Sequence, residues 1–183
     1  MDRVVTAGPR EWAEVGLPGF AVGFLAGTVA GLMALIVGQP VGWAMVAALA
    51  FALPLGALGA VYSMLLAAGK VRMGGFAPAC LFWLVGFPLA RLVQEVLTRL
   101  VLTGTPGFPP DALGFLAYQG IISAGFAIGF LWTHERLAPR WWHRMSGHNP
   151  AAARVYDRYA SHARVMWEAR EARNRRREAS KSR

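Results

Sequence analysis

The chain has 183 residues, of which 55% are hydrophobic and only 16% are charged, and its mean hydropathy is positive. This composition excludes an ordinary soluble domain, because apolar segments such as 17–37 have no polar face to turn toward water. The formal net charge of +9 lies entirely in residues 136–183, since residues 1–135 carry equal numbers of basic and acidic side chains.

Four apolar segments have about the length that a helix needs to cross a bilayer core of ~30 Å. Their expected bounds are 17–37, 41–68, 76–103 and 111–133. Gly and Pro residues predict a tight turn before the second segment and a loop before the fourth, where Asp111 is placed to cap the helix. We therefore expect an all-α polytopic integral membrane protein with a four-helix transmembrane domain at 17–134.

The connections between these segments differ in charge. Lys70 and Arg72 lie between the second and third segments, and the basic region 135–183 follows the fourth, whereas the other two connections carry no basic residue. Basic loops stay on the cytoplasmic side of a membrane. The sequence thus predicts a plasma (inner) membrane protein whose N-terminal segment 1–16 and C-terminal tail are both cytoplasmic.

Small residues recur every four positions, mainly in the first two segments. The expected helix-packing residues are Gly19, Gly23, Gly27, Gly31, Ala44, Ala48, Ala52, Gly56, Ala60, Gly125 and Gly129. Such a spacing lets helix backbones approach closely, which drives association where lipid removes the hydrophobic effect. Two arrangements fit the pattern, a hairpin of the first two helices or the docking of one face onto another chain.

A polar stripe interrupts the third segment at a spacing of three and four residues, and side chains of the fourth segment can reach the same level. The candidate ligand or ion site consists of Arg91, Gln94, Glu95, Arg99, Tyr118 and Gln119. One interpretation is an amphipathic helix at the outer membrane interface after Ala90. The others are a buried ion pair of Glu95 with Arg91 and Arg99, or a functional site for an anion, an ion or a quinone-like molecule.

The tail combines aromatic and basic side chains. The expected interfacial anchor consists of Arg140, Trp141, Trp142 and Arg144. Asn149 and Pro150 predict the start of a basic amphipathic helix that ends near residue 175, followed by a disordered end. The residues expected to dock a partner are Val155, Tyr156, Tyr159 and Met166. Anionic lipid, a partner subunit and nucleic acid are the alternatives, and nucleic acid is the least expected.

The sequence offers little chemistry. Cys80 is the single cysteine, and no phosphate-binding loop, hydrolase motif or metal-ligand cluster is present, so no metal site is predicted and the sequence identifies no particular cofactor. We therefore expect a non-enzymatic accessory or scaffold subunit of a larger membrane complex, which binds other membrane subunits or itself and anionic headgroups. The alternative is a small homo-oligomeric transporter or channel whose path the Arg91–Glu95 stripe lines; a lipid-active enzyme is less expected.

Overall fold

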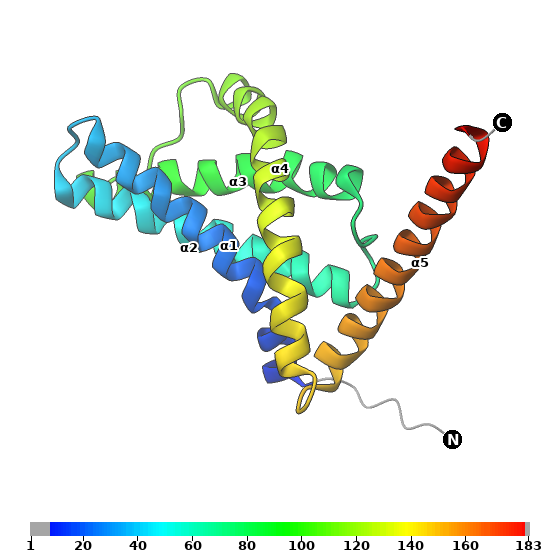
Figure 1. Cartoon of the computed structure of the whole chain (residues 1–183). Coiled ribbons are helices and arrows are strands. Elements are labelled where there is room, and N and C mark those ends of the chain that lie inside the picture. Colours follow the sequence, from blue (N-terminus) through cyan, green and yellow to red (C-terminus); the bar gives the residue numbers. More distant parts are fainter. Residues whose placement is uncertain (1–7, 182–183) are drawn as a thin grey trace.

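The structure, a computed structural model, describes residues 8–181 and is entirely helical in this range. Its helices are α1 (Pro9–Ile36), α2 (Val41–Ala67), α3 (Phe76–Thr103), α4 (Ala112–Met145) and α5 (Pro150–Lys181) (Figure 1). The first four are long and apolar enough to cross a membrane, as the sequence predicts. The first seven residues of the expected N-terminal segment lie outside the described part of the chain.

Two helix starts have clear local causes. Pro9 opens α1 at the position where a helix needs no backbone N–H, and the Gly8 N–H donates to a Glu11 carboxylate oxygen at 2.7 Å. The predicted cap of α4 is confirmed, because Asp111 Oδ1 accepts from the Gly114 N–H at 2.9 Å. α1 thus begins eight residues before the expected bound at Leu17.

The helix of the fourth apolar segment extends beyond the expected bound of that segment at residue 133. α4 continues without interruption through Pro139 to Met145, so the first part of the predicted juxtamembrane segment is helical and belongs to the same element. Side chains in this extension pack on α1, as described below, and this packing explains why the helix does not end where the apolar run ends.

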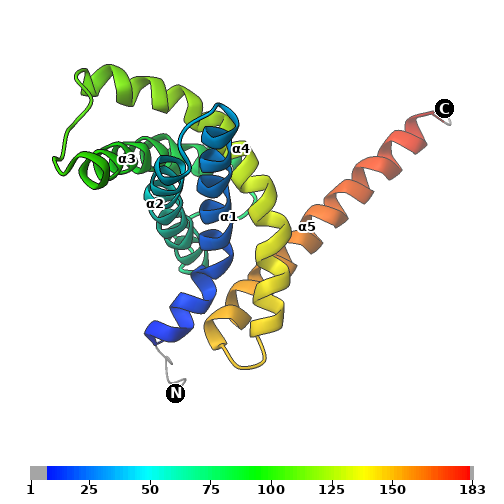
Figure 2. The ribbon, with the colours of Figure 1, turned by 90° about the vertical axis from the view of Figure 1, so that its left-hand side faces the viewer.

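The helices do not form a parallel bundle. α1 and α2 are an antiparallel hairpin, α3 packs along α2, and the yellow part of α4 crosses α3 steeply (Figure 1). Figure 2 shows that α4 bends: its first turns run over α3, and the rest descends beside α1. α5 leaves the four-helix body, and its second half projects away from it.

Small residues bring α1 and α2 into backbone contact along their length. A Cβ added at Gly19, Gly23 or Gly27 would collide with backbone atoms of α2. The small residues of α2 that face α1 are Ala44, Ala48, Ala52, Gly56, Gly59 and Ala60. The glycines of α1 therefore serve the hairpin within one chain, and Gly59, which the four-residue spacing omitted, lies at the closest approach, opposite Gly19.

Gly125 and Gly129 in α4 behave differently. A Cβ added at either glycine would meet nothing within 4 Å in the described chain. Their expected role in helix packing is therefore wrong for contacts within the described chain, although the residue type and spacing resemble those of α1. Spacing alone does not reveal whether a glycine face is covered.

An aromatic core joins α2, α3 and α4. Trp83 of α3 is fully buried, with its ring 4.6 Å from that of Phe130 and 4.7 Å from that of Phe126 in α4. Phe130 in turn contacts Tyr62 of α2 edge-on at 5.4 Å. Edge-on and tilted pairs of this kind are the arrangements that aromatic rings prefer. This core positions the lower half of α4 against the hairpin.

We expect Gly27→Leu to destabilise the protein by about 3 kcal/mol or more, because the new side chain forces two backbones apart. The midpoint of thermal unfolding in detergent should fall by on the order of 10 °C. Gly125→Leu is the matched control, since a Cβ there has open space. Equal unfolding temperatures for the two variants would contradict the role of the glycine face.

Candidate functional site

The start of α1 and the end of α4 are joined by two tryptophans. Pro18 has no backbone N–H, so the Glu14 carbonyl four residues earlier lacks its helical donor. Trp141 supplies this missing donor, because its indole Nε1 donates to the Glu14 carbonyl oxygen at 2.8 Å. Trp142 Nε1 donates to the carbonyl of Val15 at 3.1 Å. The proline and the tryptophan pair are therefore complementary, although they are far apart in the sequence.

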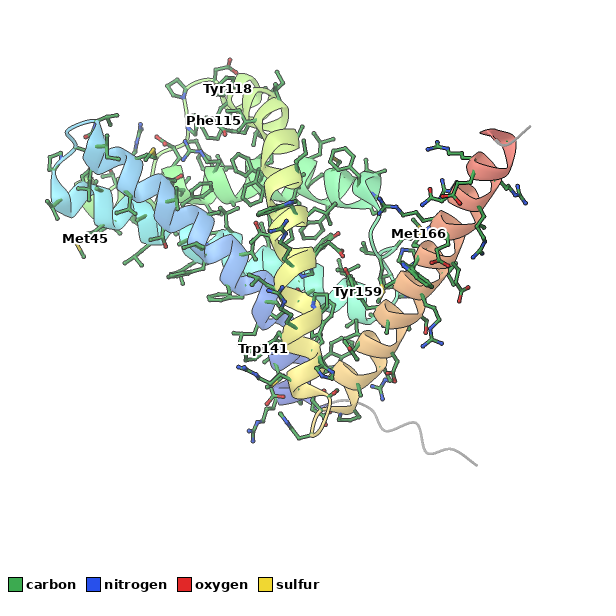
Figure 3. The ribbon with its side chains drawn as sticks, viewed as in Figure 1. Met45, Phe115, Tyr118, Trp141, Tyr159 and Met166 are labelled. Carbon is green, nitrogen blue, oxygen red and sulfur yellow. The ribbon has the colours of Figure 1, made fainter. Side chains whose placement is uncertain are left out.

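The four residues of the expected interfacial anchor differ in exposure at this junction. Trp142 is buried, with 1% of its surface exposed, so it packs inside the protein and not in a lipid interface. Trp141 is partly exposed (Figure 3), while Arg140 and Arg144 are exposed. Of the four residues, only the two arginines and one face of Trp141 remain available to a ligand.

Asn149 connects the same junction to α5. Its Oδ1 accepts from the N–H groups of Ala151 and Ala152 at 2.9 and 3.0 Å, which confirms the predicted helix cap. Its Nδ2 donates to the Glu11 carbonyl at 2.9 Å and to a Glu14 carboxylate oxygen at 3.0 Å. One side chain thus starts α5 and ties that start to α1.

The first half of α5 packs on the protein itself. Val155 is fully buried, and the ring centres of Tyr156 and His143 are 4.7 Å apart. The Tyr159 hydroxyl donates to a carboxylate oxygen of Glu135 in α4. Burial and this hydrogen bond raise the pKa of Tyr159 above its ordinary value. The expected docking role of Val155, Tyr156 and Tyr159 therefore needs correction, because they make intramolecular contacts.

Two further side chains of α5 meet the α2–α3 connection. Arg158 donates to the carbonyl of Ala67, at the end of α2 where a cation interacts favourably with the helix dipole. The His162 ring lies beside Gly74, whose φ of 65° requires the left-handed backbone that glycine adopts most easily. α5 is therefore held on α1, α2 and α4 before it leaves the body.

The second half of α5 projects away from the four-helix body and continues helically to Lys181, beyond the expected end at residue 175 (Figures 1 and 2). Val165, Met166 and Trp167 are 62%, 53% and 60% exposed, and Figure 3 shows Met166 on this part of α5. A groove of about 580 Å³ on this half is lined by Met166, Trp167, Arg170, Arg173, Asn174 and Arg177. Of the expected docking residues, only Met166 is therefore free to meet a partner.

The polar stripe of α3 is organised around Arg91. Its guanidinium donates to the side-chain oxygen of Gln94 and lies 5.3 Å from the ring centre of Phe51 in α2 and 5.9 Å from that of Phe115 in α4. Aromatic faces at such distances stabilise a cation. Arg91 is therefore partly enclosed by three helices.

The ion pairs of Glu95, one of the three interpretations of the stripe, do not form in the described chain. Glu95 makes no ion pair with Arg91 or Arg99 in the described structure, although all three lie on one continuous helix. Gln119 is buried with 5% of its surface exposed, but Tyr118 points outward with 61% exposed (Figure 3). Arg91 and Gln94 therefore contact each other, whereas the exposed Tyr118 does not join Gln119 in the buried part of the protein.

A buried Ser63–His134 pair escaped the sequence analysis. The Ser63 hydroxyl and His134 Nε2 are 2.8 Å apart, and the imidazole stacks on Phe130 at 5.4 Å. A serine beside a histidine suits nucleophilic catalysis. Here both side chains are sealed, with 0% and 1% exposed, so the pair links α2 to α4 and receives no substrate. No sequence spacing signals it, because the residues lie on different helices.

Residues 8–181 contain no group of three or more His, Cys, Asp or Glu side chains that could hold a metal ion, leaving aside the side chains that are not described. Comparison with protein families, with curated sequences and with solved structures finds no match to this chain. Two exposed surfaces of the described chain are open to a binding partner, the second half of α5 and the arginine-bearing end of α4.

The Pro18–Trp141 contact predicts a specific energetic coupling. Trp141→Phe should cost about 1–3 kcal/mol, since it leaves the Glu14 carbonyl without a donor. In a Pro18→Ala background the same change should cost clearly less, because the alanine backbone offers a helical N–H to that carbonyl. Unfolding of the four proteins of the double-mutant cycle measures the coupling. Trp132→Phe is the control at an exposed tryptophan, and equal losses in both backgrounds would rule the coupling out.

Proposed function

We propose that this protein is a non-enzymatic membrane scaffold or accessory subunit that holds α5 as a rigid arm for a partner subunit. The observation that carries the proposal is the division of α5. Its first half is fixed by buried and hydrogen-bonded side chains, whereas Val165, Met166 and Trp167 on its second half are exposed. A helix held only at one end presents the other end at low entropic cost.

The chemistry of the free half favours a protein partner with an acidic groove. Trp and Arg are the side chains that most often dominate binding at interfaces. Here Met166 and Trp167 share a groove with basic side chains spaced three and four residues apart, as a helix that enters a partner groove would present them. The basic residues of this groove are Arg170, Arg173 and Arg177.

The proposal includes an orientation. Asn149 touches α1 near its start, Arg158 touches the end of α2, and His162 lies beside Gly74. These contacts gather the start of α1, the basic 69–75 connection and α5 at one end of the molecule. Basic residues are retained on the cytoplasmic side, so we infer that this end faces the cytoplasm of a plasma (inner) membrane and meets its anionic headgroups.

The geometry favours the scaffold over a transporter. A transport path requires polar groups that converge on a cavity, and the stripe residues Arg91, Glu95 and Arg99 are not among the lining residues of four grooves that the structure describes along residues 8–181. Tyr118 is also exposed, whereas Gln119 is buried. Arg91 is instead enclosed by Phe51 and Phe115, as a structural cation is.

Cysteine labelling of intact cells tests the orientation. In a protein whose Cys80 is replaced by Ala, an impermeant maleimide should label cysteines introduced at Gln39 and Thr105. It should leave those at Lys70 and Arg173 unlabelled until the cells are permeabilised. Labelling of Lys70→Cys in intact cells would reverse the assignment.

Photo-crosslinking tests the docking arm. A photoreactive amino acid at Trp167 should give a discrete adduct with one other membrane subunit, and one at Arg154, in the fixed half of α5, should not. Val165→Ala, Met166→Ala and Trp167→Ala combined should weaken the complex by at least ~30-fold, as expected when hot-spot side chains are lost.

Arg164→Ala with Glu168→Ala is the matched control on the same free half. Adducts only with a second copy of this chain, or only with lipid, would contradict a heteromeric docking arm and identify self-association or membrane anchoring instead.

A further inference from the structure

A groove runs between α1 and α4 on the outside of the four-helix body. Its lower part has a volume of about 360 Å³ and is lined by Leu17, Pro18, Ala21, Leu137, Arg140, Trp141 and Arg144. Its upper part has a volume of about 280 Å³ and is lined by Val22, Leu25, Ala26, Val29, Phe126, Gly129, Phe130 and Thr133. The lining residues follow one another along both helices, so the lower part, which has the basic end, and the apolar upper part lie in line between α1 and α4.

The basic end has two guanidiniums one helical turn apart. Arg140 and Arg144 are exposed, and neither forms an ion pair with a side chain in the described range. Other arginines nearby are occupied: Arg136 lies 3.9 Å from the centre of the Trp132 ring, and Arg158 binds the end of α2. Two free guanidiniums side by side suit a phosphate group, which they bind with charge-assisted hydrogen bonds.

Trp141 fixes one wall of this end. Its Nε1 is committed to the Glu14 carbonyl at 2.8 Å, so the indole cannot turn away, and its ring borders the groove together with Pro18. A tryptophan that is polar at one edge and apolar over its face is typical of the level where headgroups meet acyl chains. The Trp141 hydrogen bond, which replaces the helical donor missing at Pro18, therefore also positions one wall of the basic end of the groove.

The apolar end has the length of one lipid tail. From Leu137 to Phe126 the groove follows α4 for ~16 Å at 1.5 Å per residue, and one leaflet of a bilayer core is ~15 Å thick. Gly129 has no side chain that could fill the groove, and a Cβ added there would meet no atom within 4 Å. The space beside Gly129 is therefore open to a ligand. An acyl chain is the apolar group in a membrane that fits a groove of this length.

We propose that the α1–α4 groove binds one anionic phospholipid, with its phosphate on Arg140 and Arg144 and one acyl chain between α1 and α4 up to Gly129. The inference depends on the membrane insertion and orientation under the proposed function, because it assigns the basic end to the anionic cytoplasmic leaflet. It does not depend on the partner of α5, whose free half lies outside this groove.

Native mass spectrometry of the full-length protein in detergent tests the headgroup end. Titrated with phosphatidylglycerol and phosphatidylcholine of equal chain length, the wild type should retain one phosphatidylglycerol at least about tenfold more tightly. Arg140→Gln with Arg144→Gln should abolish that preference, as the loss of charge-assisted bonds predicts. Arg136→Gln, an arginine of the same helix outside the groove, is the matched control and should keep the preference.

A glycine pair tests the acyl end. Gly129→Leu fills the groove without a backbone collision and should weaken retention of both lipids at least about fivefold. Gly125→Leu makes the same change in open space outside the groove lining and should have no effect. Competition by inorganic phosphate distinguishes a lipid site from a site for free phosphate. Inorganic phosphate should not displace the lipid at concentrations that saturate a free-anion site.

Several outcomes would overturn the assignment. Equal retention of the two lipids by the wild type, an unchanged preference in the arginine double variant, or equal effects of the two glycine variants would each do so. Displacement by inorganic phosphate would leave an anion site only. If the double variant does not fold, the single change Arg140→Gln carries the same comparison. Loss of the lipid with an intact Trp167 adduct separates this result from failure of the docking arm, and inverted cysteine labelling identifies failure of the orientation.

Discussion

The backbone contact between α1 and α2 is the constraint on which the other packing depends. At Gly19 and Gly59 the two helices lie so close that neither position has room for a side chain, and the approach continues at Gly23 and Gly27. Lipid removes the hydrophobic drive for helix association, so close van der Waals contact has to supply it. The resulting hairpin offers a fixed surface to α3 and α4, and through α1 to the start of α5.

Proline in α1 has a structural consequence outside its own helix. Pro18 leaves the Glu14 carbonyl open, and Trp141 closes it from α4. The neighbouring bond from Trp142 and the two bonds from Asn149 place four side-chain hydrogen bonds within two turns of α1. Hydrogen bonds are stronger in an apolar environment than in water, and they are directional, which aliphatic packing is not. These four bonds therefore determine where α4 ends and where α5 begins.

Both proposed surfaces follow from this junction. By fixing the first turn of α5, Asn149 lets the exposed Trp167 project at a defined angle. By fixing Trp141, the Glu14 carbonyl gives the α1–α4 groove a rigid wall beside Arg140. A scaffold that holds a partner at a membrane surface needs both a rigid arm and a stable seat in the bilayer. We infer that the arm and the lipid site serve these two needs from one structural element.

The sequence by itself determined the four apolar helices, the caps at Asp111 and Asn149, and the small-residue face of α1, because length, apolar content and capping are local properties. Only the tertiary structure decided that Gly19 is covered and Gly129 is open. It also decided that Trp142 is buried. These outcomes depend on which helices meet and at what angle, and the spacing of residues within one helix does not specify its partner: glycines at the same spacing are covered in α1 and open in α4.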